Sequence, residues 1–75
     1  MRKIEVGKKY KHFKGHDVLI LHIGKHSESL EKMIIYRHLD TDEIWVRPYE
    51  MFISEVDHDK YPNVTQKYRF EEVDN

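Results

Sequence analysis

Two side chains suited to ligand binding, Trp45 and Arg47, stand two positions apart in the segment 44–48, Ile-Trp-Val-Arg-Pro. If this segment is a strand, both side chains point to the same face. A guanidinium beside an indole offers a fork of donors and a flat surface for stacking, which suits a carboxylate, a phosphate or a nucleobase. We therefore predict a binding groove for an anionic small molecule or an acidic peptide. Its candidate residues are Trp45, Arg47, Tyr36, His26 and Arg37.

A structural interpretation of the same segment is also open. Trp45 would then be the main anchor of a modest core, and Arg47 would lie along it to pair with Glu50 or Glu55. Removing a buried large aromatic by Trp45→Ala would cost roughly 3 to 5 kcal/mol and abolish folding in so small a domain. A single Arg47→Lys substitution separates the two interpretations, because a ligand fork needs arginine geometry and an exposed ion pair does not.

Arg37 adds to the groove hypothesis. It follows Ile35 in an apolar segment and shares a side with Met33 and Leu39, where an unpaired charge would be costly. Arg37 must therefore meet an acid, a ligand or water.

Nucleic-acid binding is the second function class, because the start of the chain interleaves basic and aromatic residues. Residues 1–14 carry six basic residues against Glu5 alone, whereas residues 40–75 carry ten acidic residues against four basic ones. A phosphate backbone would bind the basic end and the affinity would fall steeply with salt, although the net charge of −1 disfavours this class. The alternative is that the two ends fold against each other. The candidate residues are Lys8, Lys9, Tyr10, Lys11 and Lys14.

Catalytic and metal chemistry are weakly indicated. His26-Ser27-Glu28 contains hydrolase residue types, but neighbours in an extended chain point to opposite faces, so His26 is poorly placed as a base for Ser27. The chain has six histidines and no cysteine. His22 and His26 share parity on a strand, and a zinc site would draw on His12 and His38 as well, yet the spacing matches no known zinc site. We expect no enzyme activity, no metal and no cofactor.

The sequence predicts that short strands position these residues. Gly15 suits a turn that needs positive φ, Gly24 suggests a bulge, and Pro48 ends a strand because it lacks a backbone donor. The apolar run 18–23 reads as a strand covered on both faces. Residues 49–52 predict one helical turn, and an α+β alternative extends that helix to residue 56. The predicted strands are 8–13, 18–23, 32–39, 44–47, 53–56 and 67–70.

Five or six short strands at this spacing predict a mainly β fold, a small SH3-like barrel with at most one short helical turn. Seventy-five residues allow one domain, 1–75, near the lower limit for a chain held by its core alone. The absence of cysteine, of a signal-peptide run and of a membrane-length apolar stretch indicates the cytoplasm and no membrane. Oligomeric state is not indicated by the sequence.

Several linked motifs resemble a family of small, stand-alone bacterial proteins of unknown function. They are Tyr10-Lys11-His12-Phe13-Lys14-Gly15, His26-Ser27-Glu28, Tyr36-Arg37, Trp45-Val46-Arg47-Pro48 with Met51-Phe52, and Arg69-Phe70. The resemblance spans nearly the whole chain and implies a compact, mainly β, bacterial cytosolic domain. It implies no activity. Ser29 stands where a threonine is usual, and the stretch 57–67 is longer than the family's turn.

Overall fold

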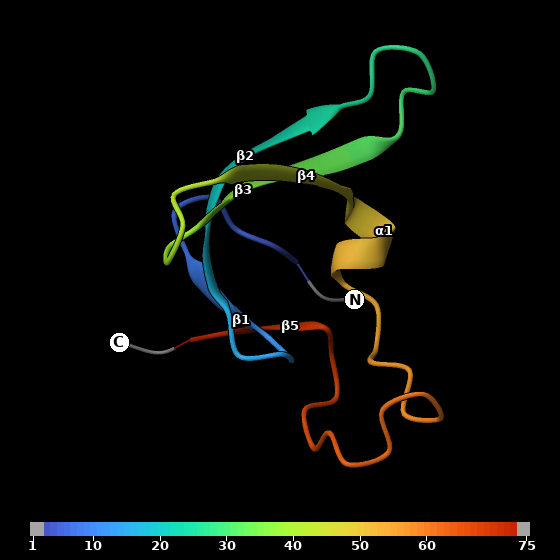
Figure 1. The fold of residues 1–75 in the computed structure, drawn as a ribbon. Coiled ribbons are helices and arrows are strands. Elements are labelled where there is room, and N and C mark those ends of the chain that lie inside the picture. Colours follow the sequence, from blue (N-terminus) through green and yellow to red (C-terminus); the bar gives the residue numbers. More distant parts are fainter. Residues whose placement is uncertain (1–2, 74–75) are drawn as a thin grey trace.

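The computed structural model describes residues 3–73, which form one curved antiparallel sheet and one short helix (Figure 1). Residues 1–2 and 74–75 of the predicted domain lie outside the described residues. The strand order is β4-β3-β2-β1-β5, so β4 and β5 are the edges and the sheet is not closed. A mainly β fold is confirmed. The elements are β1 (Lys9–His12), β2 (Asp17–Lys25), β3 (Lys32–His38), β4 (Ile44–Pro48), α1 (Tyr49–Phe52) and β5 (Phe70–Glu72).

The predicted turns and the helical turn are confirmed. Gly15 has φ +96° in the turn between β1 and β2, a conformation that glycine adopts without strain. Pro48 ends β4, an edge strand, where a missing backbone donor is tolerated. Helix α1 ends at Phe52, so the alternative with a helix to residue 56 is wrong. Within residues 3–73, no helix has the length and apolar character to cross a membrane.

Three details of the strands differ from the sequence predictions. The bulge in β2 lies between Ile20 and His22, whereas Gly24 pairs regularly with Met33. The run 18–23 is not covered on both faces, because its fully buried residues are Val18 and Ile20 alone. The strands predicted at 53–56 and 67–70 reduce to one bridge between Glu55 and Tyr68, followed by β5 at residues 70–72.

The hydrophobic core lies on the inner face of the curved sheet, and Trp45 is not part of it. Phe52 of α1 stacks on Phe70 of β5 with ring centroids 4.0 Å apart, and it meets Tyr10 and Tyr36 edge-on. Trp45 is 46% exposed, so the prediction of a core around it is wrong. The physical reason is that α1 brings Phe52 over the sheet as the central aromatic. The core cluster is Ile4, Tyr10, Val18, Ile20, Ile34, Tyr36, Phe52 and Phe70.

The oppositely charged ends of the chain meet, as the structural interpretation of the charge asymmetry proposed. Strand β1 pairs with β5, and Lys11 lies directly opposite Glu71 in that pairing. The basic start and the acidic end therefore form neighbouring strands, which reduces the net field of either end.

Candidate functional site

The inner face of the sheet continues past the core into a hollow of about 320 Å³. The alternation of the strands places its residues. In β1, Tyr10 enters the core and His12 lines the hollow. In β3, Tyr36 enters the core and His38 lines the hollow. We call this space the aromatic hollow, and its lining residues are His12, His16, Tyr36, His38, Asp40, Thr41, Glu43, Trp45, Arg47 and Phe70.

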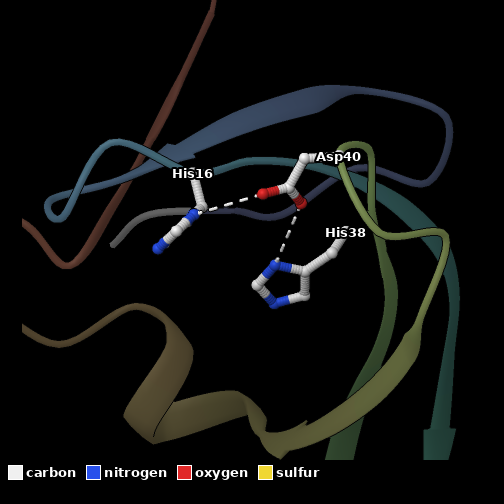
Figure 2. A group of neighbouring side chains, drawn as sticks. All are labelled: His16, His38 and Asp40. Carbon is white, nitrogen blue, oxygen red and sulfur yellow. Dashed lines mark ion pairs between the residues drawn. The ribbon is translucent and has the colours of Figure 1, made fainter.

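Two imidazoles and one carboxylate gather at the rim of the aromatic hollow (Figure 2). His16 Nδ1 lies 3.6 Å from one oxygen of Asp40, and His38 Nδ1 lies 4.0 Å from the other. His16 belongs to the turn between β1 and β2, His38 ends β3, and Asp40 follows in the next turn. These three residues could hold a metal ion, because one ligand atom from each lies within 4.8 Å of the others.

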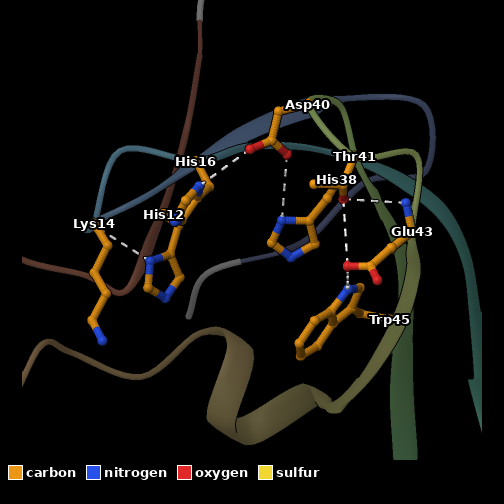
Figure 3. Close-up of polar contacts among 8 residues, drawn as sticks. All are labelled: His12, Lys14, His16, His38, Asp40, Thr41, Glu43 and Trp45. Carbon is orange, nitrogen blue, oxygen red and sulfur yellow. Dashed lines mark hydrogen bonds and ion pairs between the residues drawn. The ribbon is translucent and has the colours of Figure 1, made fainter.

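Trp45 forms the wall of the hollow next to His38 (Figure 3). It pairs across the strands with Tyr36, and its ring centroid lies 5.2 Å from that of His38. Its indole Nε1 donates a hydrogen bond of 3.4 Å to Glu43, which holds the ring at the rim. The exposed face of the indole is thus available for stacking with a ligand.

Arg47 lies at the floor of the hollow and is half-buried. Its Nε donates a hydrogen bond of 3.3 Å to the Tyr36 hydroxyl, and its guanidinium carbon lies 5.5 Å from the Phe70 ring centroid. Across residues 3–73, no ion pair joins Arg47 to a carboxylate. The expected pairing with Glu50 or Glu55 is therefore not found, and Arg47 lines the hollow without such a partner in this part of the chain.

His12 stands beside Arg47 and is uncharged at neutral pH. Burial, and next the positive charge of Arg47, lower the pKa of His12 to about 4. Its Nδ1 accepts a hydrogen bond of 3.1 Å from the Lys14 backbone, which assigns the ring proton to Nε2. His12 therefore contributes a neutral N–H donor next to a cation.

A second hollow of about 290 Å³ shares His12 and Arg47 with the first. We call it the basic hollow, because four cationic side chains and one carboxylate line it. The ammonium of Lys14 lies 5.5 Å from the Tyr61 ring centroid, a cation–π distance. An aromatic wall and a cationic floor are thus adjacent on one surface. The residues of the basic hollow are His12, Phe13, Lys14, Arg47, Asp57, Lys60, Tyr61 and Arg69.

Of the five groove residues predicted from the sequence, the structure brings Tyr36, Trp45 and Arg47 together in the aromatic hollow. His26 and Arg37 line neither hollow. His26 sits in the β2–β3 loop, where its Nδ1 accepts hydrogen bonds from the backbone of Glu28 and Ser29.

Arg37 points to the opposite face of β3 from Tyr36, because adjacent residues of a strand alternate. Its Nε lies 3.9 Å from the Asp42 carboxylate, so it meets an acid, one of the three outcomes expected for it. The contact is too long for a hydrogen bond, and Nε itself is buried without a hydrogen-bond partner among the described residues. The Arg37 side chain is 40% exposed, so its charge also reaches water.

The basic segment expected to contact nucleic acid is divided between surfaces. Tyr10 is 2% exposed and packs in the core, so it has no face free to stack on a base. Lys14 lines the basic hollow, whereas Lys9 and Lys11 alternate with Tyr10 and point away from the inner face. The predicted residues therefore do not share one surface, and of the five it is Lys14 that lines a hollow.

Sequence reasoning left His16, Asp40 and Glu43 out of the site. The signal that could have found them is topological: the turns at 13–16 and 39–43 both flank the pairing of β2 with β3, where Val18 lies opposite His38. Adjacent hairpin turns at one end of a sheet bring their side chains together.

Comparison with known proteins identifies the chain's family and nothing more specific. No curated protein and no solved structure matches the chain significantly. Residues 8–72 match a family described as protein of unknown function, DUF1653, which confirms the resemblance to a family without an established activity. The match covers nearly the whole chain, which therefore belongs to the DUF1653 family.

Proposed function

We propose that this protein is a cytosolic binding module for an anionic small molecule that carries a flat ring. The observation that carries the proposal is Arg47, a half-buried guanidinium that lines two hollows and donates a hydrogen bond to a neutral hydroxyl. Among residues 3–73 it forms no ion pair with a carboxylate, and a half-buried cation of this kind favours an anion in the adjacent space.

The surroundings of Arg47 support the same ligand class. Arg69, Lys14 and Lys60 add positive charge on the basic side, where a carboxylate or phosphate would sit. Trp45 and His38 offer flat rings on the other side. Hollows of about 290 and 320 Å³ are at the lower end of the range that small-molecule sites occupy. The acidic side chain of a peptide has the same chemistry and is the second occupant to test.

Fold and localisation enter this proposal only as support. The strand order, with one helical turn between the fourth and fifth strands, favours an SH3-like arrangement. In this arrangement the ligand would bind to the inner face of the sheet. The absence of cysteine favours a reducing compartment. We assign no catalytic step to the module.

The test is a thermal-shift screen of small carboxylates, phosphates, nucleotides and acidic peptides on the wild type and on Arg47→Lys. Lysine keeps the charge but loses the fork and the stacking plane, so at least one ligand should raise the melting temperature of the wild type and not of the variant. Arg37→Lys is the matched control, because Arg37 lies on the neighbouring strand and outside both hollows. Ligands that stabilise all three proteins equally would exclude Arg47 as the anchor.

Nucleic-acid binding is the second candidate function, and the salt dependence of binding distinguishes it from binding of a small anion. Binding to a phosphate backbone weakens steeply with ionic strength, whereas a site with one or two ion pairs responds weakly. Nucleic-acid binding would be favoured if oligonucleotides bind strongly at low salt and lose affinity as salt is added, and if Arg47→Lys leaves this binding unchanged.

A further inference from the structure

The imidazole nitrogens of His16 and His38 and the carboxylate of Asp40 are not used by the anion site just proposed, which uses only the flat ring of His38. They gather from two turns at one end of the sheet, at the rim of the aromatic hollow (Figure 2). We propose that these three residues form a binding site for a divalent transition-metal ion of the zinc class. This inference goes beyond the proposed function and can be tested with the metal ion alone.

The distances in the cluster are longer than those around a bound metal, but they are within reach of them. Ligand atoms about 2.0 to 2.1 Å from a tetrahedral Zn²⁺ lie about 3.3 Å from one another. Here one ligand atom from each of the three residues lies within 4.8 Å of the others, so the side chains must move closer together to hold an ion. The side chains of His16 and Asp40 are 48% and 56% exposed, which leaves both of them room for this movement.

The backbone holds the three residues at one place. The His16 carbonyl accepts a hydrogen bond of 2.7 Å from His12, which closes the β1–β2 turn. The Leu39 amide donates a hydrogen bond of 3.1 Å to Asp17, which ties the residue before Asp40 to the residue after His16. His38 is fixed further by its ring contacts with Tyr36 and Trp45. Sites held by hydrogen-bonded elements lose less entropy on binding.

The donor types select the ion. Two nitrogens and one carboxylate suit Zn²⁺, Co²⁺, Ni²⁺ or Cu²⁺, whereas Mg²⁺ and Ca²⁺ require oxygen ligands throughout. Three protein ligands leave at least one coordination position of the metal open. Since all three residues line the aromatic hollow, water or another small donor can reach that position from the hollow.

The alternative for the cluster is an ion-pair network without metal, in which Asp40 pairs with the two histidines. The two interpretations differ in their response to added metal. A metal site takes up one ion saturably and loses affinity when one of its ligands is removed, whereas an ion-pair network does neither.

The experiment is calorimetric titration of the untagged full chain with Zn²⁺, Ni²⁺ and Co²⁺ above neutral pH, with Mg²⁺ as a negative control. The wild type should bind one transition-metal ion saturably. Asp40→Asn should weaken that binding by about tenfold or more, as should His38→Gln. Asp40 is exposed, so Asp40→Asn should leave the fold intact even if His38→Gln does not. The visible absorption of bound Co²⁺ should change between the wild type and Asp40→Asn.

His22→Gln is the matched control, because His22 is exposed on β2 away from the cluster and its loss should leave the titration unchanged. Arg47→Lys should also bind the metal like the wild type, so failure of the anion site and failure of the metal site are distinguishable. Absence of saturable binding, or equal affinity in wild type and Asp40→Asn, would overturn the proposal and leave the ion-pair network as the role of the cluster.

Discussion

The inner face of the sheet has a closed end and an open end, built by the same strands. At the closed end, Tyr10 of β1 and Tyr36 of β3 are 2% and 1% exposed beneath Phe52. Two residues further along each strand, His12 and His38 line the aromatic hollow. Alternation makes each pair share a face. The difference between the ends is that α1 crosses one and not the other.

This comparison shows that strand parity assigns a side chain to a face but not to a core. Burial depends on which distant segment returns over that face, here α1, whose Phe52 is fully buried. The residue types agree with the division. The fully covered positions are tyrosines, and the partly covered ones are histidines, which tolerate both apolar contact and water.

The largest effect is expected when the Phe52 ring, which covers the closed end of the sheet, is removed. Phe52→Ala deletes a fully buried ring that stacks on Phe70 at 4.0 Å, and truncations of this kind cost about 3 to 5 kcal/mol. A domain of this length has a total stability of about 4 to 11 kcal/mol. We expect the variant to be largely unfolded or to melt far below the wild type, measured by urea denaturation followed by far-UV circular dichroism.

Met51→Ala is the matched control for Phe52→Ala, since Met51 precedes Phe52 in α1 and is 46% exposed. Its free energy of unfolding should stay within about 0.5 kcal/mol of the wild type. A Phe52→Ala protein as stable as Met51→Ala would show that the closed end does not depend on α1.

The next test concerns His12, at the boundary between the two ends. Burial, followed by the Arg47 charge, lowers the pKa of His12 in the native state to about 4 from 6.5. As the pH falls below about 6.5, His12 binds a proton in the unfolded chain but not in the native state. The free energy of unfolding therefore decreases until the pH reaches about 4. Above about pH 7.5, both states are neutral and His12 contributes no pH dependence.

His12→Asn removes this titration and keeps an acceptor for the Lys14 amide. Between about pH 7 and pH 4 the wild type should lose on the order of 1 to 2 kcal/mol more of its free energy of unfolding than the variant, a value reduced from the full shift because the ring is partly solvated. Urea denaturation at several pH values measures the difference. Parallel pH profiles for the two proteins would contradict the assignment of a neutral His12.

Much of the fold follows from local sequence signals. Gly15 supplies the positive φ of its turn, Pro48 ends an edge strand, and residues 49–52 form the predicted helical turn. The bulge was misplaced because glycine is one cause of a bulge among several, and here the irregularity lies between Ile20 and His22. The last strand was misplaced because the alternation of polar and aromatic residues covers 67–70 and stops there, whereas the pairing with β1 runs from Phe70 to Glu72.

Three residues of the candidate site were also predicted from the sequence. Trp45 and Arg47 share a parity, and Tyr36 lies opposite Trp45 in the neighbouring strand. The membership of Asp40 depends on two turns meeting in space, which no local pattern contains. His26 and Arg37 were included by residue type, and the local geometry of a loop and of a strand's outer face excludes them from the hollows.

The smallest effect is expected at Trp45, where the open end differs most from a core. Its side chain is 46% exposed and makes one hydrogen bond to Glu43 and one ring contact with His38. Trp45→Ala should therefore change the free energy of unfolding by no more than about 1 kcal/mol, far below the 3 to 5 kcal/mol of a buried aromatic. Urea denaturation alongside Phe52→Ala measures both in one series.

A second variant, Trp45→Phe, divides the contribution of Trp45 between its ring and its N–H group. Phenylalanine keeps a flat ring against His38 but cannot donate to Glu43. If the ring serves ligand stacking, the thermal shift given by an anionic ligand should survive in Trp45→Phe and disappear in Trp45→Ala, while both variants stay folded. Loss of folding in Trp45→Ala would instead place the indole in the core, and the open end of the sheet would then lose its wall as a binding surface.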